Sequence, residues 1–130
     1  MADDLISALI AWLRQQLDDD ERIATAARQA APGTWAGMHR DVHAIDPQAG
    51  STSHVLTADT GALAVHAARH HPDRVLRDVA ANRRILDLYD VSTDEQLSPD
   101  GWELMKHTVR ALALTYADRP GYLDEWRVTA

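Results

Sequence analysis

The chain contains no cysteine and no phenylalanine, and it has no long run of apolar residues. The lack of cysteine excludes disulfides, thiolate zinc ligands and cysteine nucleophiles, so any metal would have to be held by histidine, aspartate or glutamate. No apolar run approaches the roughly 20 residues that a membrane-spanning helix needs. The formal net charge of −7 disfavours nucleic acid as a partner, because phosphates bind cationic surfaces.

Several enzyme motifs are also missing. The sequence has no Gly-rich phosphate loop, no Gly-x-Ser-x-Gly elbow and no dinucleotide fingerprint. This disfavours nucleotide-dependent and serine-hydrolase chemistry. The acidic start, with Asp3 and Asp4, differs from the basic start of a signal peptide. We therefore expect a cytoplasmic protein without a membrane segment.

The composition is that of a soluble globular protein, with 45% hydrophobic and 25% charged residues. We expect a single domain over residues 1–130 of mainly α (α+β) class. It would be a helical bundle of about four helices, with a small two-stranded β-hairpin between the first and second helices. The expected parts are an N-terminal helix (1–31), a variable hairpin (34–58), a proline-cornered helix pair (59–90) and a C-terminal helix with a docked tail (98–126).

The helices are predicted by apolar residues at helical spacing and by their end signals. The acidic run at 18–21 is either a solvated turn of the first helix or a break in it. Asp59 or Thr60 begins the second helix, and Pro72 occupies the first turn of the third. Ser98, before a proline, predicts the start of the last helix.

The helical period disappears between residues 34 and 58, where β-branched residues and a turn at 46–50 predict the hairpin. His39, Asp41 and His43 alternate in this segment. In a strand, alternate side chains share one face, so these three would lie together.

Two histidines on the second helix are candidate metal ligands. His66 and His70 are four residues apart, and positions i and i+4 are neighbours on a helix. A divalent ion bound there would need more ligands from His39, His43, Asp41 or Asp59. The helix lacks the glutamate that follows the first histidine in zinc proteases. The alternatives are hydrogen bonds from these histidines to backbone carbonyls or carboxylates, or a general-base role without metal.

Arginines are concentrated around the proline corner. Between residues 66 and 84 there are five arginines and two aspartates, a local balance of +3. The candidate binding surface consists of Arg69, Arg74, Arg77 and Arg84. Together with Arg83, these side chains could pair with the acidic run at 18–21, receive phosphate at the Pro72 helix N-terminus, or bind an acidic surface of a partner protein.

Two blocks of sequence resemble one family of small proteins from actinobacteria and their phages, grouped as domain of unknown function 6221. The blocks are His66-x-Ala68-Arg69-His70-x-Pro72-x-Arg74-Val75-Leu76-Arg77, continuing to Arg84-Ile85-Leu86, and Tyr116-Ala117-Asp118-x-Pro120-x-Tyr122-x-x-Glu125-Trp126. The resemblance covers most of the chain except 36–60. His71 departs from the aspartate usual in such proteins. The resemblance implies a fold and a genomic neighbourhood, but no activity.

No complete catalytic constellation is present in the sequence. We therefore favour a non-catalytic protein-binding or regulatory module that meets an acidic partner surface and needs no cofactor. The alternative is a small metal-binding protein or metal-dependent enzyme that uses His66 and His70.

Overall fold

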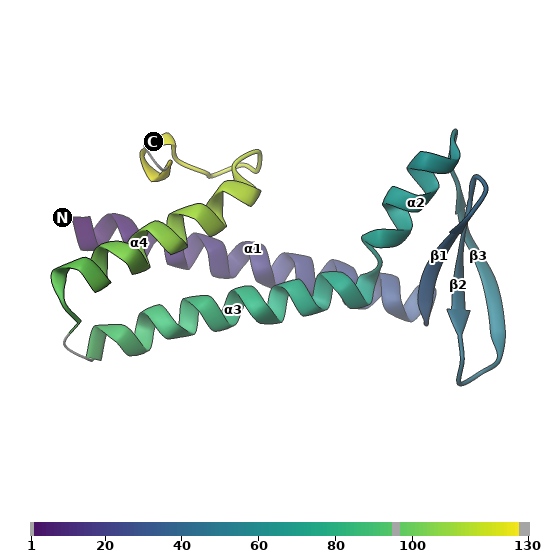
Figure 1. The fold of residues 1–130 in the computed structure, drawn as a ribbon, viewed down its shortest axis with the longest axis horizontal. Coiled ribbons are helices and arrows are strands. Elements are labelled where there is room, and N and C mark those ends of the chain that lie inside the picture. Colours follow the sequence, from purple (N-terminus) through teal and green to yellow (C-terminus); the bar gives the residue numbers. More distant parts are fainter. Residues whose placement is uncertain (1, 95–96, 128–130) are drawn as a thin grey trace. The chain divides into compact units, whose positions relative to one another are not determined.

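The computed structural model describes residues 2–94 and 97–127, and Figure 1 shows the order of its elements. The four α-helices are α1 (Ala2–Ala30), α2 (Gly61–Arg69), α3 (Pro72–Asp94) and α4 (Pro99–Ala113). The three strands are β1 (Thr34–Met38), β2 (Asp41–Asp46) and β3 (Ser51–Thr57). Two short 3₁₀ helices follow α4, η1 (Leu114–Tyr116) and η2 (Asp124–Trp126). The predicted mainly helical class with four helices is confirmed.

The β segment between α1 and α2 is a three-stranded antiparallel sheet in the order β1-β2-β3, so the predicted two-stranded hairpin is wrong. The missed feature is a two-residue turn at His39 and Arg40, which pairs Met38 with Asp41. His39 has φ 58°, a conformation that glycine or asparagine usually supplies in such turns. Because neither residue is a turn former, the sequence carried no signal of this turn.

The helix ends follow their predicted signals. Thr60 caps α2, and its hydroxyl accepts a hydrogen bond from the Leu63 N–H at 3.3 Å. Ser98 caps α4 in the same way through the Gly101 N–H at 3.2 Å. Of the two interpretations of the acidic run at 18–21, the solvated turn is correct, because α1 continues through it without a break.

The contacts divide the chain into two compact units. Unit 1 comprises Met1–Asp19 and Ala80–Ala130, and unit 2 comprises Asp20–Val79. The long helices α1 and α3 each contribute residues to both units. None of the described helices is both long enough and apolar enough to cross a membrane.

The core of unit 1 is formed by the first half of α1, the second half of α3, and α4. Leu9, Leu13 and Leu17 follow one face of α1 and are completely buried. Full burial of a leucine side chain contributes about 1.5–3 kcal/mol, so this stripe is a main source of stability. The tail returns to this core through Trp126, which is 3% exposed.

The core of unit 2 lies between α2 and one face of the sheet. Val42 on β2 packs with Ala64 and Ala68 of α2, and Trp35 lies at the edge of this cluster. The small alanines let the helix approach the sheet closely. A Cβ added to Gly37 would lie 3.2 Å from the Val65 backbone.

Candidate binding site at the α2–α3 corner

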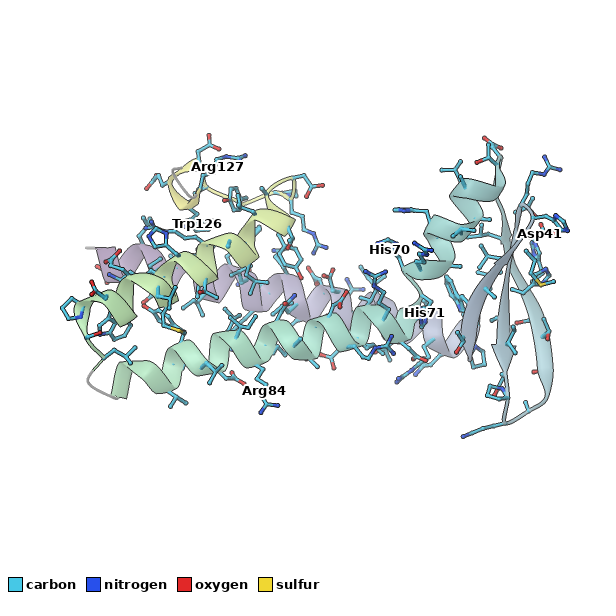
Figure 2. All side chains as sticks on the ribbon, in the orientation of Figure 1. Asp41, His70, His71, Arg84, Trp126 and Arg127 are labelled. Atoms are coloured by element: carbon cyan, nitrogen blue, oxygen red, sulfur yellow. The ribbon has the colours of Figure 1, made fainter. Side chains whose placement is uncertain are left out.

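The chain turns from α2 into α3 at His70 and His71. The backbone N–H of His70 donates to the Ala67 carbonyl oxygen at 3.1 Å, which closes the last turn of α2. His71 is outside both helices, and Pro72 is the first residue of α3. Proline disfavours helical geometry in the residue before it, which explains the break at His71. Figure 2 shows His70 and His71 where the chain passes from α2 to α3.

The His66 and His70 side chains are neighbours, as their spacing predicts. Their ring centroids are 4.5 Å apart, and the rings are tilted by 41°. Nδ1 of His70 lies 2.9 Å from the His66 carbonyl oxygen, which can only accept a hydrogen bond. Nδ1 therefore carries the proton, and Nε2 of His70 remains as the possible ligand atom. A hydrogen bond from a histidine to a backbone carbonyl is also the alternative to metal binding that the sequence suggested.

The other candidate metal ligands lie elsewhere in unit 2. Val42 and Ala44 of β2 are buried on the side of α2, so the alternating Asp41 and His43 lie on the opposite face of the sheet. His39 belongs to the β1–β2 turn rather than to a strand. Among residues 2–94 and 97–127, no group of three histidine, aspartate or glutamate side chains could hold a metal ion.

The outer face of the sheet carries a polar cluster. The Thr57 hydroxyl donates to Oδ1 of Asp41 at 2.6 Å, and Nε2 of His54 lies 2.9 Å from the same hydroxyl. His54 is also 3.5 Å from Asp41, and its ring contacts that of His43 at a centroid distance of 5.6 Å. The Thr57 hydrogen bond, and then the neighbouring His54, hold the pKa of Asp41 below its ordinary value.

The predicted arginine surface is divided between the two units. Arg69, Arg74 and Arg77 belong to unit 2, and Arg84 belongs to unit 1. Arg74 donates to the Arg69 carbonyl oxygen at 2.9 Å, and its Nε lies 4.0 Å from Asp78. The predicted pairing with the acidic run is confirmed for Arg83, whose Nη2 lies 2.6 Å from Asp18.

A shallow groove of about 370 Å³ lies beside this corner. Trp35, Ala36 and Gly37 of β1 form one wall. Val65, Ala68 and Arg69 of α2 form the other wall, and His71 completes it. Nδ1 of His71 is buried and makes no hydrogen bond within the described part of the chain. The groove therefore combines an apolar lining with an arginine, and it includes a histidine whose Nδ1 is buried.

A family model matches residues 6–128, nearly the whole chain, and it is described as a family of unknown function, DUF6221. The chain belongs to this family. No curated protein and no solved structure matches the chain. Membership of DUF6221 thus agrees with the resemblance of the helix pair and the tail. It assigns no activity to the protein.

Two features of the site in this DUF6221 protein, His54 and the groove, were not predicted from the sequence. His54 was recoverable, because a turn at 47–50 pairs Asp46 with Ser51 and brings residue 54 opposite His43. The groove was not recoverable, because it depends on where α2 crosses β1. That crossing is set by the packing of small residues, which hydrophobic periodicity does not specify.

Proposed function

We propose that this DUF6221 protein is a non-catalytic protein-binding module whose exposed arginines meet an acidic partner surface. The observation that carries the proposal is that three guanidinium groups are exposed and form no ion pair with described residues. Arg69, Arg77 and Arg84 are exposed, and none of them forms an ion pair with any described residue. Arginine matches carboxylates with two parallel hydrogen bonds, so such groups are well suited to an acidic partner.

Other arginines of the chain form ion pairs with nearby aspartates. Arg14 contacts Asp87 and Asp90 at 3.2 and 2.6 Å, and Arg28 lies 3.7 Å from Asp73. In a chain with a net charge of −7, carboxylates are plentiful. Arginines that remain outside ion pairs in such a chain are therefore the natural contacts for carboxylates of another molecule.

Charge reversal tests this proposal. Proteins captured by the parent chain are compared with those captured by Arg77→Glu and by Arg84→Glu, and a captured partner is then purified and titrated by calorimetry. We expect at least a tenfold loss of affinity for one or both variants, a smaller loss for the Arg→Gln changes, and weaker binding at high salt. Unchanged affinity in both reversed variants, with folding intact by circular dichroism, would refute the arginine surface.

The adjacent His66 and His70 rings favour a second candidate, a small metal-binding protein or metal-dependent enzyme. The backbone hydrogen bond to Nδ1 of His70 orients the ring, as such bonds do for metal ligands. The test is the metal content of the untagged protein, purified without chelator, beside the double variant His66→Ala/His70→Ala. About one ion per chain in the parent alone would support this candidate, and no ion in either protein would reject it.

A further inference from the structure

Strand β1 has a free edge. Met38 and Asp41 pair across a two-residue turn, and the residues that flank such a turn exchange both backbone hydrogen bonds. Hydrogen-bonded and non-hydrogen-bonded positions alternate along the strand. The backbone N–H and C=O groups that form hydrogen bonds with β2 therefore belong to Thr34, Ala36 and Met38. The N–H and C=O groups of Trp35 and Gly37 therefore point away from β2. No backbone partner for them is present in the described part of the chain.

The free edge opens into the groove beside the α2–α3 corner. Trp35, Ala36 and Gly37 are the β1 wall of that groove, so this wall includes both residues whose backbone groups point away from β2. The volume of about 370 Å³ is open rather than enclosed, which suits a short extended segment. An added strand would hydrogen-bond to Trp35 and Gly37, as in strand addition to other exposed sheet edges.

The α2 wall specifies the side chains that fit. Val65 is 43% exposed, and Arg69 is exposed one helical turn further along. Such i and i+4 positions are about 5–6 Å apart between Cβ atoms. Alternate side chains of a strand, which share a face, are separated by roughly 6.6–6.8 Å. One side chain of an added strand can thus lie on Val65 while the next on the same face reaches Arg69.

The net charge of unit 2 opposes an acidic segment only weakly. Residues 20–79 contain seven acidic and six basic side chains, a balance of −1 with neutral histidines. The rest of the chain contains thirteen acidic and seven basic side chains, a balance of −6. A carboxylate therefore meets less repulsion at the groove than the net charge of the chain suggests.

We propose that the edge of β1 binds an extended segment of a partner protein as a fourth strand, with the pattern apolar–any residue–acidic. The apolar side chain contacts Val65, and the carboxylate pairs with the Arg69 guanidinium. This site rests on the proposed protein-binding function and names the partner's chemistry. It predicts that backbone hydrogen bonds, and not arginine charge alone, hold the partner.

The probe is a set of four blocked peptides, Ac-Thr-Φ-Thr-Glu-Thr-NH₂, in which Φ is Val, Ile, Leu or Phe. Each is titrated into the full chain labelled with ¹⁵N. We expect shifts of the Trp35 and Gly37 backbone amides and slower hydrogen exchange there, since both N–H groups gain an acceptor. Replacing Glu by Gln should weaken binding at least fivefold, and N-methylation of the central amides should abolish it. No shift with any peptide at 5 mM, or shifts confined to β3, would overturn the proposal.

Variants of α2 separate this site from the wider arginine surface. Arg69→Glu should lower the affinity of the Glu-containing peptides at least tenfold. Arg77→Glu lies outside the groove and should change their affinity less than twofold. Val65→Ser should weaken binding, and its matched control is Leu63→Ser, an exposed apolar residue of the same helix that does not line the groove. If Arg77→Glu or Arg84→Glu weakens the binding of a purified partner while Val65→Ser and Arg69→Glu do not, the proposed function stands and the β1 site is wrong. If the peptides bind β1 but arginine reversal leaves the partner unaffected, the wider arginine surface is wrong.

Discussion

The indole Nε1 of Trp12 donates a hydrogen bond to the carbonyl oxygen of Pro120 at 3.3 Å. The next residue, Gly121, has φ 92°, and a Cβ there would lie 2.7 Å from the same nitrogen. The tail thus crosses the indole at a position without a side chain. Tyr122 and Trp126 then pack against Trp12 with centroid distances of 5.7 and 5.5 Å. These contacts hold the tail on α1 within unit 1.

Gly121→Ala should destabilise unit 1 by about 2–4 kcal/mol, because it adds backbone strain to a collision with the Trp12 indole. The matched control is Gly50→Ala. Gly50 has φ 62°, but a Cβ there would meet no atom within 4 Å, so only strain of about 1–2 kcal/mol is expected. Urea unfolding measures both. Equal losses would show that the contact with Trp12 contributes nothing.

Trp126→Ala should cost about 3–5 kcal/mol, the usual range for removing a large buried aromatic side chain. Its Nε1 is buried and has no hydrogen-bond partner among the described residues. Trp126→Phe removes that unsatisfied group while keeping much of the ring, so we expect a clearly smaller loss. The measurement is thermal unfolding of both variants. A Phe variant as unstable as the Ala variant would contradict this account.

Helices were predictable wherever a local signal was sufficient. Ser98 and Thr60 are capping residues, and Pro72 constrains the residue before it, so three helix starts were fixed by neighbouring residues alone. The same holds for the i, i+4 contact of His66 and His70. In each case the interaction spans at most four residues.

Features that depend on long-range packing were not predictable in this way. The turn at His39 has no turn-forming residue, and only pairing of β1 with β2 makes its positive φ acceptable. The groove is lined by Trp35 together with residues about thirty positions later in the chain, including Val65. Residue patterns indicate which face of each element is buried. The strand register and the position at which the helix crosses the strand are set by packing.

The ion pairs of Arg14 in unit 1 should contribute a modest, salt-dependent stability. Its guanidinium contacts Asp87 and Asp90 and is 36% exposed, so Arg14→Ala should cost about 0.5–1 kcal/mol at low salt. The loss should shrink at 1 M salt because of screening. A double-mutant cycle with Asp87→Asn/Asp90→Asn measures the coupling by urea unfolding. Strictly additive losses would show that Arg14 is not energetically coupled to the two aspartates.

The pKa of Asp41 should rise when the Thr57 hydroxyl is removed. That hydroxyl donates to the ionised carboxylate, which is the main cause of the lowered pKa, and His54 lowers it further. Thr57→Val should therefore move the pKa of Asp41 towards its ordinary value of about 3.9. Carboxyl ¹³C chemical shifts followed against pH report this pKa directly. Thr52→Val is the control, because Thr52 lies exposed on the same strand and has no hydrogen bond to Asp41.

The sign of the stability effect follows from the lowered pKa. In the acid range the unfolded chain binds more protons at Asp41 than the folded chain does, so folding is favoured as the pH rises. The stabilisation is fully present above the unfolded pKa of about 3.9 and is lost as the pH falls through the lower folded pKa. Because the side chain is exposed, we expect a small effect, and Asp41→Asn should remove it. A parent chain and an Asp41→Asn variant with the same acid dependence would show that the Thr57 hydrogen bond does not favour the ionised carboxylate.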